Sequence, residues 1–307
     1  MLLTVSAVLF YVIIILASDV EKIIANLSKV TLWYYFIIFP LYFSIIVITS
    51  WRYQLVLKKT GIILNFKNSF FIYTAGLSML ITPGGMGEII KSHILKQKLD
   101  RSLSSTAPIV IYEKWLEFLS IVIVIGILLF WADFIEAKIV FIVGIILCVA
   151  VYLTFTNSKY IGILNKITGK IKFIKKLTVD VNQFQKTSKE LMRPAFFVKM
   201  ISITMLTKII IIFTIFLIFR SFEVEFDIFQ SGQIFLTSLM AGALSFIPGG
   251  LLITETGLLG LILKYGVEFS LASLLVLVIR FISLWFITLV GFCALKIISN
   301  KDIVESK

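Results

Sequence analysis

Several ionisable side chains lie inside stretches of the sequence that are otherwise almost wholly apolar. Glu113, Lys114 and Glu117 share one such stretch, and Arg280 lies within another. At the centre of a bilayer a charged side chain costs ~2.5–3.5 kcal/mol on the insertion scale, so it needs a partner or a water-filled cavity. Because Glu113 and Glu117 lie at i,i+4 spacing on one helical face, they also need a cation or a proton between them.

Two Pro-Gly-Gly sequences, at residues 83–85 and 248–250, each end an apolar run. Proline lacks an amide donor and glycine frees the backbone, so a helix stops there. Each break is followed by an acid, Glu88 or Glu255, in a stretch too apolar to be an ordinary loop. We interpret the two breaks as functional sites inside the membrane, each with an acidic residue close by. The alternative is that each break is only a tight structural kink.

These groups are expected to line one central polar cavity. The cations Arg280 and Lys114 would bind phosphate, and Glu88, Glu113 and Glu255 would take a cationic headgroup or a coupling proton. Pairing of the same charges as structural salt bridges is the alternative. No catalytic residue, metal site or cofactor is expected. The candidate substrate-binding residues are Pro83, Gly84, Gly85, Glu88, Lys91, Glu113, Lys114, Glu117, Pro248, Gly249, Gly250, Glu255 and Arg280.

Long apolar runs must position these residues. Of 307 residues, 59% are apolar and 15% are charged, which excludes a soluble domain. A helix needs about 20 apolar residues to cross the hydrocarbon. The sequence therefore predicts an all-α polytopic membrane protein. No basic residue precedes the first run, which favours a retained helix over a signal sequence. The six predicted full transmembrane helices are Leu2–Ala17, Leu32–Trp51, Ala107–Trp131, Ala137–Thr156, Ala195–Phe219 and Leu271–Leu295.

The positive charges indicate the orientation of the chain. A cytoplasmic N-terminus places residues 52–68, 91–101, 157–193 and 296–307 inside, and these segments hold 20 of the 29 Lys and Arg. The positive-inside rule favours this orientation, so both termini are expected to be cytoplasmic. Topology and anionic lipid surfaces explain the net charge of +12 without nucleic acid.

Two further apolar runs, Phe70–Thr82 and Ile228–Ile247, end at the breaks rather than in charged loops. The first is about 20 Å long as a helix, too short for a ~30 Å core. We expect two re-entrant hairpins that enter from opposite faces. The breaks lie 165 residues apart, which indicates an inverted repeat.

The predicted organisation is a single membrane domain, 1–307. Its half-repeats would be residues 1–135 and 136–296, followed by a polar tail, 297–307. Within the second half, the basic segment 157–193 is expected to be an amphipathic helix on the inner leaflet, or alternatively a solvated connector.

The motifs resemble those of the lysylphosphatidylglycerol synthase transmembrane region, also called the flippase-like domain family. The likeness rests on Thr-Pro-Gly-Gly-Met-Gly-Glu at 82–88, then Lys91, Tyr-Glu-Lys at 112–114, Ile-Pro-Gly-Gly through to Glu at 247–255, and Arg280. It covers nearly the whole chain. The family has Arg at the positions of Lys91 and Lys114, so this chain lacks the planar fork that suits phosphate there.

The resemblance implies a lipid flippase of the cell (plasma) membrane. Its cargo would be an anionic or aminoacylated phospholipid, or a polyprenyl-linked glycolipid. The chain itself is not expected to be an enzyme, since its longest polar segment, 157–193, leaves no room for the soluble aminoacyl-transferring domain. Membrane lipids are the expected partners, and a separate synthase or glycosyltransferase and a homo-oligomer are compatible with the sequence.

Two alternatives stay open. The inverted hairpins would equally serve an ion-coupled transporter of a small solute. The chain would otherwise be a membrane accessory subunit of a lipid-modifying or glycosylation enzyme. A lipid opening between crossings, rather than a closed polar pathway, distinguishes the flippase from the solute transporter.

Overall fold

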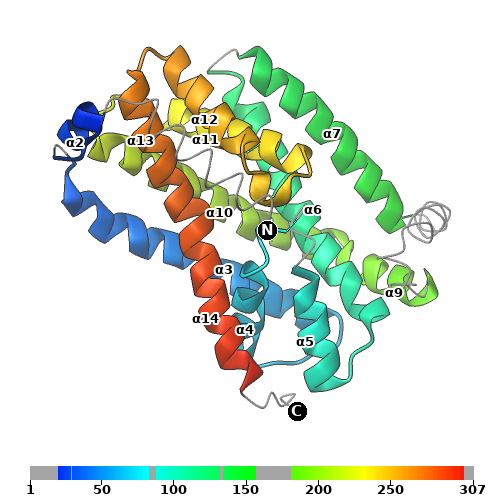
Figure 1. Cartoon of the computed structure of the whole chain (residues 1–307). Helices are drawn as coiled ribbons and strands as arrows, with labels where there is room; N and C mark the ends of the chain where they lie inside the picture. The colour runs from blue at the N-terminus through cyan, green and yellow to red at the C-terminus, as the bar shows by residue number, and fades with distance from the viewer. Residues whose placement is uncertain (1–19, 29, 83–87, 132–133, 157–180, 301–307) are drawn as a thin grey trace.

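The computed structural model describes residues 20–28, 30–82, 88–131, 134–156 and 181–300 (Figure 1). The predicted crossing Leu2–Ala17, the first Pro-Gly-Gly and residues 157–180 of the basic segment lie outside them. The described chain is helical and contains no strand. Its helices are α2 (Val20–Ser28), η1 (Leu32–Tyr34), α3 (Tyr35–Lys59), α4 (Phe66–Leu77), α5 (Ile90–Leu99), α6 (Leu103–Leu128), α7 (Ile135–Thr156), α9 (Val181–Leu191), α10 (Pro194–Ser221), α11 (Ile228–Leu244), η3 (Pro248–Gly250), α12 (Ile253–Lys264), α13 (Phe269–Arg280), η4 (Phe281–Phe286) and α14 (Ile287–Ser299).

Four of the described helices are long and apolar enough to cross a membrane. They are Leu32–Lys59, Ile135–Thr156, Pro194–Ser221 and Phe269–Ser299. Each coincides with one of the six predicted crossings, so the all-α membrane class is confirmed. Helix α6 has 26 residues but carries three charges in its middle. Whether it crosses the membrane, and the total number of crossings, stay predictions.

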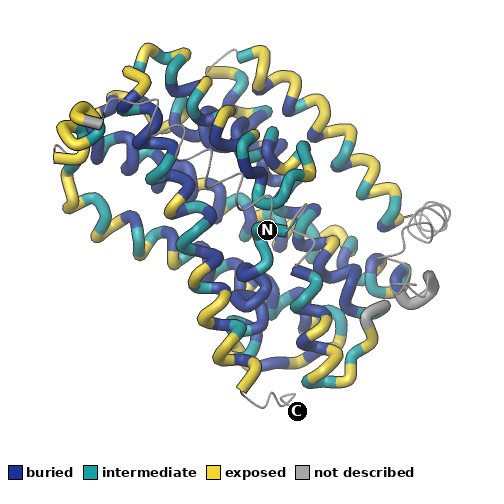
Figure 2. Tube along the Cα trace, viewed as in Figure 1, coloured by how far each residue is buried: buried dark blue, intermediate teal, exposed yellow. Residues whose placement is uncertain are grey.

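The outward helix faces are apolar. Only 22% of the most apolar window of α7 is buried, against 50% for α10, so α7 is peripheral and α10 central. Figure 2 shows exposed positions along the whole of α7. A soluble protein would place polar residues there, whereas a lipid-facing helix keeps apolar ones. The exposed large side chains of α7 include Ile139, Ile142, Ile145, Ile146 and Val149.

Polar residues fix where three helices begin. The side chains of Asn65 and Ser102 accept hydrogen bonds from backbone N–H groups in the first turns of α4 and α6. Asp227 and Gln230 form a reciprocal capping box at the start of α11. Each cap satisfies a backbone donor that the helix itself leaves unpaired. The two short apolar runs therefore start at polar caps and end at the breaks.

Those two runs form hairpins. Helix α4 packs against α5, and α11 packs against α12. The first hairpin lies in the lower part of Figure 1 and the second in the upper part. With 12 and 17 residues, α4 and α11 are about 18 and 26 Å long, less than the ~30 Å hydrocarbon core.

The helix predicted for the first short run, Phe70–Thr82, extends too far at its C-terminal end. Helix α4 ends at Leu77, not Thr82, and the intervening residues continue as turns with i→i+3 backbone bonds, beginning with Ser78 N–H to Ala75 O. At the end of the α-helical pattern the backbone of Gly291 in α14 lies directly against Ser78, with no room for a Cβ.

The helices of the two halves pack by the same plan. Helix α3 packs on α4 in the first half, and α10 packs on α11 in the second. Likewise α5 packs on α6, and α12 packs on α13. Each first hairpin helix also contacts the other half, α4 through α14 and α11 through α6. Helices α3 and α10 pack against each other between the halves. Each hairpin is thus enclosed partly by helices of the opposite half.

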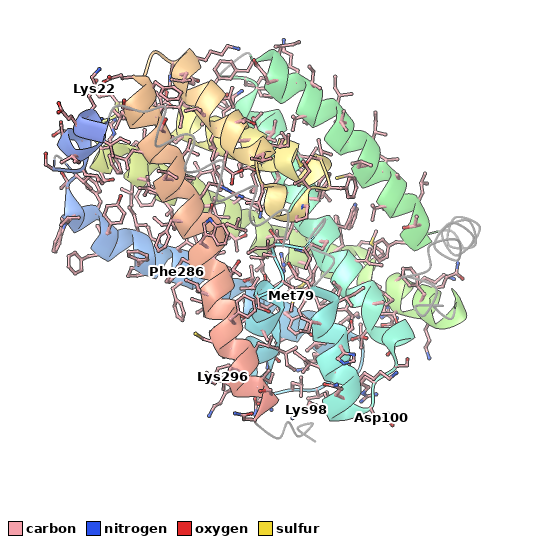
Figure 3. The ribbon with its side chains drawn as sticks, in the orientation of Figure 1. Lys22, Met79, Lys98, Asp100, Phe286 and Lys296 are labelled. Atoms are coloured by element: carbon pink, nitrogen blue, oxygen red, sulfur yellow. The ribbon has the colours of Figure 1, made fainter. Side chains whose placement is uncertain are left out.

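Exposed charged residues lie at two opposite ends of the molecule. Lys22 of α2 pairs with Glu268 before α13 at 2.6 Å. Lys98, Asp100 and Lys296 lie at the other end, with apolar side chains between (Figure 3). This is the arrangement expected of a protein whose two ends contact water.

Candidate functional site

Lys91 of α5 is wholly buried between the first hairpin and α6. Its ammonium donates to Glu88 Oε2 at 3.0 Å and to Glu113 Oε2 at 2.8 Å. The rings of Tyr53 and Tyr73 lie 5.3 and 4.9 Å from the same nitrogen. The two carboxylates neutralise the charge, and the ring faces offset the lost hydration.

The stem of Lys91 reaches this position across a glycine. A Cβ on Gly76 of α4 would lie 2.7 Å from Cγ of Lys91. Any residue larger than glycine at position 76 would therefore displace the Lys91 side chain.

Lys91 belongs to a larger series of alternating charges. Lys114 bonds Glu88, and Lys208 of α10 bonds Glu117. Arg52 of α3 donates to Glu117 Oε1 at 2.7 Å. We call this series the ionic chain; in order of contact it is Lys114, Glu88, Lys91, Glu113, Arg52, Glu117 and Lys208.

Arg52 provides the cation that the two acids of α6 require. It also donates to Thr204 Oγ1 at 2.6 Å. Its second pairing, Nη2 to Glu113 Oε1, is longer at 3.8 Å and is no hydrogen bond. Within the described residues, Arg52 Nε and Glu113 Oε1 are buried without a hydrogen-bond partner. The Arg52–Glu113 contact is the weakest connection of the ionic chain.

The second break carries a simpler arrangement. Arg280 donates from Nε to Glu255 Oε1 at 2.7 Å and from Nη2 to the carbonyl oxygen of Gly249 at 2.8 Å. Both side chains are at most 2% exposed. One guanidinium thus holds the acid of α12 and the backbone of the break together, using its fixed fork of donors.

Glycine is required in this break for two reasons. Gly249 and Gly250 both have φ of +63°, a region that L side chains rarely adopt. A Cβ on Gly242 of α11 would also lie 3.2 Å from Gly250 Cα and 2.0 Å from the Thr254 hydroxyl. The backbone of the break therefore lies directly against α11.

The tips of the two hairpins meet. A Cβ on Gly249 would lie 3.6 Å from Ile81 Cα, just before the first break. The buried side chains of Leu251 and of Leu284 from η4 pack together here, and they are covered by Leu80, Ile81 and Ile247. The second break thus reaches the residues that precede the first.

A cavity of about 510 Å³ lies where α3, α6, α10 and the hairpin tips come together. One part of its wall is charged, and the rest is apolar. The charged residues that line it are Arg52, Glu88, Lys91, Glu113, Lys114, Glu117, Lys208 and Arg280.

The rim of this cavity includes apolar side chains that face outward. Ile111 of α6 is 40% exposed and Phe246, before the second break, is 63% exposed, and both also line the cavity. Leu147 and Val151 of the peripheral helix α7 line it as well. Exposed or lining apolar side chains of α6, α7 and the second hairpin thus border the charged part of the cavity wall.

The structure brings most of the predicted site residues together. Ten of the thirteen lie in the described residues, and Pro83, Gly84 and Gly85 lie outside them. Glu255 does not line the cavity as predicted, although its partner Arg280 does. Eight do line it: Glu88, Lys91, Glu113, Lys114, Glu117, Gly249, Gly250 and Arg280; Pro248, like Glu255, does not.

Two cations of the ionic chain were not predicted. Arg52 was assigned to the inner loop after Trp51, which is wrong because α3 continues to Lys59 and buries Arg52 two turns before its end. Lys208 stands out in the sequence as a lone cation inside an apolar run, but its partner, Glu117, becomes visible only when α10 packs on α6. His93 is exposed and bonds Gln97, apart from the cavity.

The sequence comparisons identify the family of the chain. Residues 2–291 match the family described as "Lysylphosphatidylglycerol synthase TM region". A UPF0104 membrane protein of Pyrococcus horikoshii is 25% identical, with 99% of this chain and 98% of the relative covered. UPF0104 membrane proteins of Methanocaldococcus jannaschii (24% identical; 98% and 95% covered) and Methanothermobacter thermautotrophicus (24%; 82% of both) are also similar.

No solved structure matches the chain. The family match spans nearly the whole sequence, and the cavity lies within the matched residues. The apolar outer faces and the four candidate spans are those of a membrane protein. The chain is a membrane protein that belongs to the lysylphosphatidylglycerol synthase transmembrane-region family.

Proposed function

We propose that this protein is a lipid translocase, which moves the polar headgroup of a lipid across the bilayer while the acyl chains stay in the hydrocarbon. The observation that carries the proposal is the cavity itself, which combines buried charges on its wall with exposed apolar side chains at its rim. A headgroup would contact the charges, and the tails would pass between Ile111 and Phe246.

The apolar rim favours a lipid over a small water-soluble solute. A solute has to leave and enter water, so its pathway is lined by polar groups along its length. Here the charged wall is bordered by Ile111, Phe246, Leu147 and Val151. That boundary suits a molecule with one polar and one apolar end.

The proposal includes a topology. Six full crossings and two re-entrant hairpins of opposite polarity, with both termini in the cytoplasm, are supported by three findings. The helices of the hairpins are short, their tips meet, and the two halves pack by the same plan. The charged residues that the positive-inside rule assigns to opposite sides also lie at opposite ends of the molecule.

The proposal further treats the plasma membrane as the location and the chain as a transporter rather than an enzyme. A partner synthase or glycosyltransferase would supply the lipid. Turnover of a lipid by the purified protein, without any exchange between leaflets, would overturn this part of the proposal.

The test is a leaflet-exchange assay in proteoliposomes. Phosphatidylglycerol with a fluorophore on one acyl chain is incorporated, and dithionite then bleaches the outer-leaflet label. We expect bleaching well beyond half of the label with protein present, and about half in empty vesicles. Exchange at the rate of empty vesicles for every lipid tested contradicts the proposal.

A matched pair of variants tests the route. Ile111→Trp narrows the rim, whereas Ile123→Trp alters another exposed position of α6 that does not line the cavity. We expect the first to slow exchange at least fivefold and the second to leave it unchanged. Equal effects of the two variants would show that lipid does not pass between α6 and the second hairpin.

A further inference from the structure

We infer that the cavity selects a headgroup with a net negative charge, and that the phosphate of this headgroup binds between Lys114 and Lys208. The inference rests on the proposed function and names the chemistry of its cargo. It excludes a headgroup made cationic by an attached amino acid as the preferred cargo.

The charge balance of the ionic chain is the first argument. Among the described residues it contains four cations and three carboxylates, so it carries a surplus of one positive charge. The second break adds nothing, because Arg280 and Glu255 neutralise each other. A low-dielectric cavity with an uncompensated charge binds a counterion. One negative charge completes the balance.

The order of the ionic chain locates the surplus. Every carboxylate lies between two cations, and a cation stands at each end. Lys91 and Arg52 each contact two carboxylates of the ionic chain, whereas Lys114 and Lys208 each contact one. The two end lysines are therefore the least neutralised cations of the series.

Accessibility distinguishes Lys114 from the other cations. The side chains of Lys91 and Arg52 are each 1% exposed, Lys208 is 5% exposed, and Arg280 is bonded to an acid and a carbonyl. Lys114 is 36% exposed, and both end lysines line the cavity. An entering anion would contact Lys114 first.

The helix geometry brings the two ends of the ionic chain near each other. Lys114 and Glu117 lie one turn apart on α6, at i,i+3 spacing, which places their Cβ atoms about 5–6 Å apart. Lys208 is bonded to Glu117, so its ammonium lies beside the turn that carries Lys114. A phosphate bridging the two ammonium groups would close the ionic chain into a ring of alternating charge.

A cationic headgroup fits the same site poorly. It would add a second uncompensated positive charge. Its amino group would also have to displace a lysine from Glu88 or Glu117, since each of these acids already contacts two cations. Neutral and zwitterionic headgroups lack this penalty but do not neutralise the surplus charge.

The test compares three acyl-labelled lipids in vesicles of phosphatidylcholine. Phosphatidylglycerol has one net negative charge, phosphatidylcholine none, and lysylphosphatidylglycerol one net positive charge. We expect phosphatidylglycerol to exchange at least tenfold faster than the other two. Equal rates for all three would overturn the inference and leave lipid translocation standing, whereas no exchange of any would overturn translocation itself.

Substitution of the end lysines sharpens the test. Lys114→Gln or Lys208→Gln removes the surplus, and phosphatidylglycerol should then exchange no faster than phosphatidylcholine. The double variant reverses the net charge, so lysylphosphatidylglycerol should become the fastest. Retention of the wild-type preference in the double variant contradicts the inference.

These variants are expected to fold, because Glu88 remains paired with Lys91 and Glu117 remains paired with Arg52. Lys199→Gln on α10 is the matched control, since Lys199 is exposed and does not line the cavity. A further arm loads vesicles with labelled glycerol phosphate. Its passage without exchange of phosphatidylglycerol would assign the anion site to a soluble phosphate and overturn the lipid assignment.

Discussion

At the first break Glu88 lies between Lys114 and Lys91, whereas at the second Glu255 meets the single guanidinium of Arg280. The two acids lie 167 residues apart, and Lys114 and Arg280 lie 166 apart, so the pairs occupy equivalent positions of the predicted repeat. Their surroundings differ. The first pair extends into the ionic chain, and the second is closed and tied to a backbone carbonyl.

This difference would give the two pairs of the predicted repeat separate roles. The Arg280 fork stabilises the break by joining α12, α13 and the Gly249 carbonyl. Lysine at position 114 has no such fork, is paired with one acid of the ionic chain, and lines the cavity with a side chain that is 36% exposed. In the second half Arg280 would hold the break in place, and in the first half Lys114 would bind the headgroup.

The largest effect is expected from an interior cation of the ionic chain. Arg52→Gln leaves Glu113 and Glu117 with one cation each in a buried setting, so stability should fall by about 3–5 kcal/mol. The measurement is thermal unfolding in detergent. Lys58→Gln, an exposed position on the same helix, is the control and should change nothing measurable. Equal stability of the two variants would show that the buried series is not a structural unit.

A smaller effect is expected at the second break. Arg280→Gln leaves the Glu255 carboxylate buried without its guanidinium, at a cost of about 3 kcal/mol. In the double variant with Glu255→Gln neither member of this pair is charged, so its loss should be smaller than the sum of the single losses. A double-mutant cycle on the unfolding free energy measures this coupling. Additive losses would mean that the pair contributes nothing as a pair.

The smallest expected effect concerns the backbone of the break. Gly249→Ala forces a side chain into the left-handed region and should cost about 1–2 kcal/mol. Gly260→Ala, in α12 with no atom near the added Cβ, should instead be neutral or stabilising by up to about 1 kcal/mol. Unfolding midpoints compare the two variants. A stabilised Gly249→Ala would exclude the strained conformation.

The sequence predicted those features that depend on local rules. Charges in apolar runs are costly, so Glu113, Lys114, Glu117 and Arg280 could be recognised one by one as requiring partners. The position of the second break follows from its proline and glycines, whereas the first Pro-Gly-Gly lies outside the described residues. The i,i+4 spacing of the two acids even required a cation, though it did not say which.

Features that depend on packing between helices were missed. Arg52 stood next to the predicted end of a crossing, and only the extension of α3 to Lys59 places it in the interior. Lys208 and Glu117 lie 91 residues apart and meet because α10 packs on α6. The spacing of residues in the sequence also did not indicate that Arg280 would line the cavity and Glu255 would not.

The separate roles of the two breaks are tested most directly by measuring lipid exchange and thermal unfolding together. Lys114→Gln is compared with the double variant Glu255→Gln/Arg280→Gln, using labelled phosphatidylglycerol and phosphatidylcholine. We predict that Lys114→Gln keeps the wild-type unfolding midpoint and loses the preference for phosphatidylglycerol. The double variant should unfold at lower temperature and, per folded protein, keep that preference. The opposite result, with selectivity lost only in the double variant, would contradict the assignment of headgroup binding to the first break.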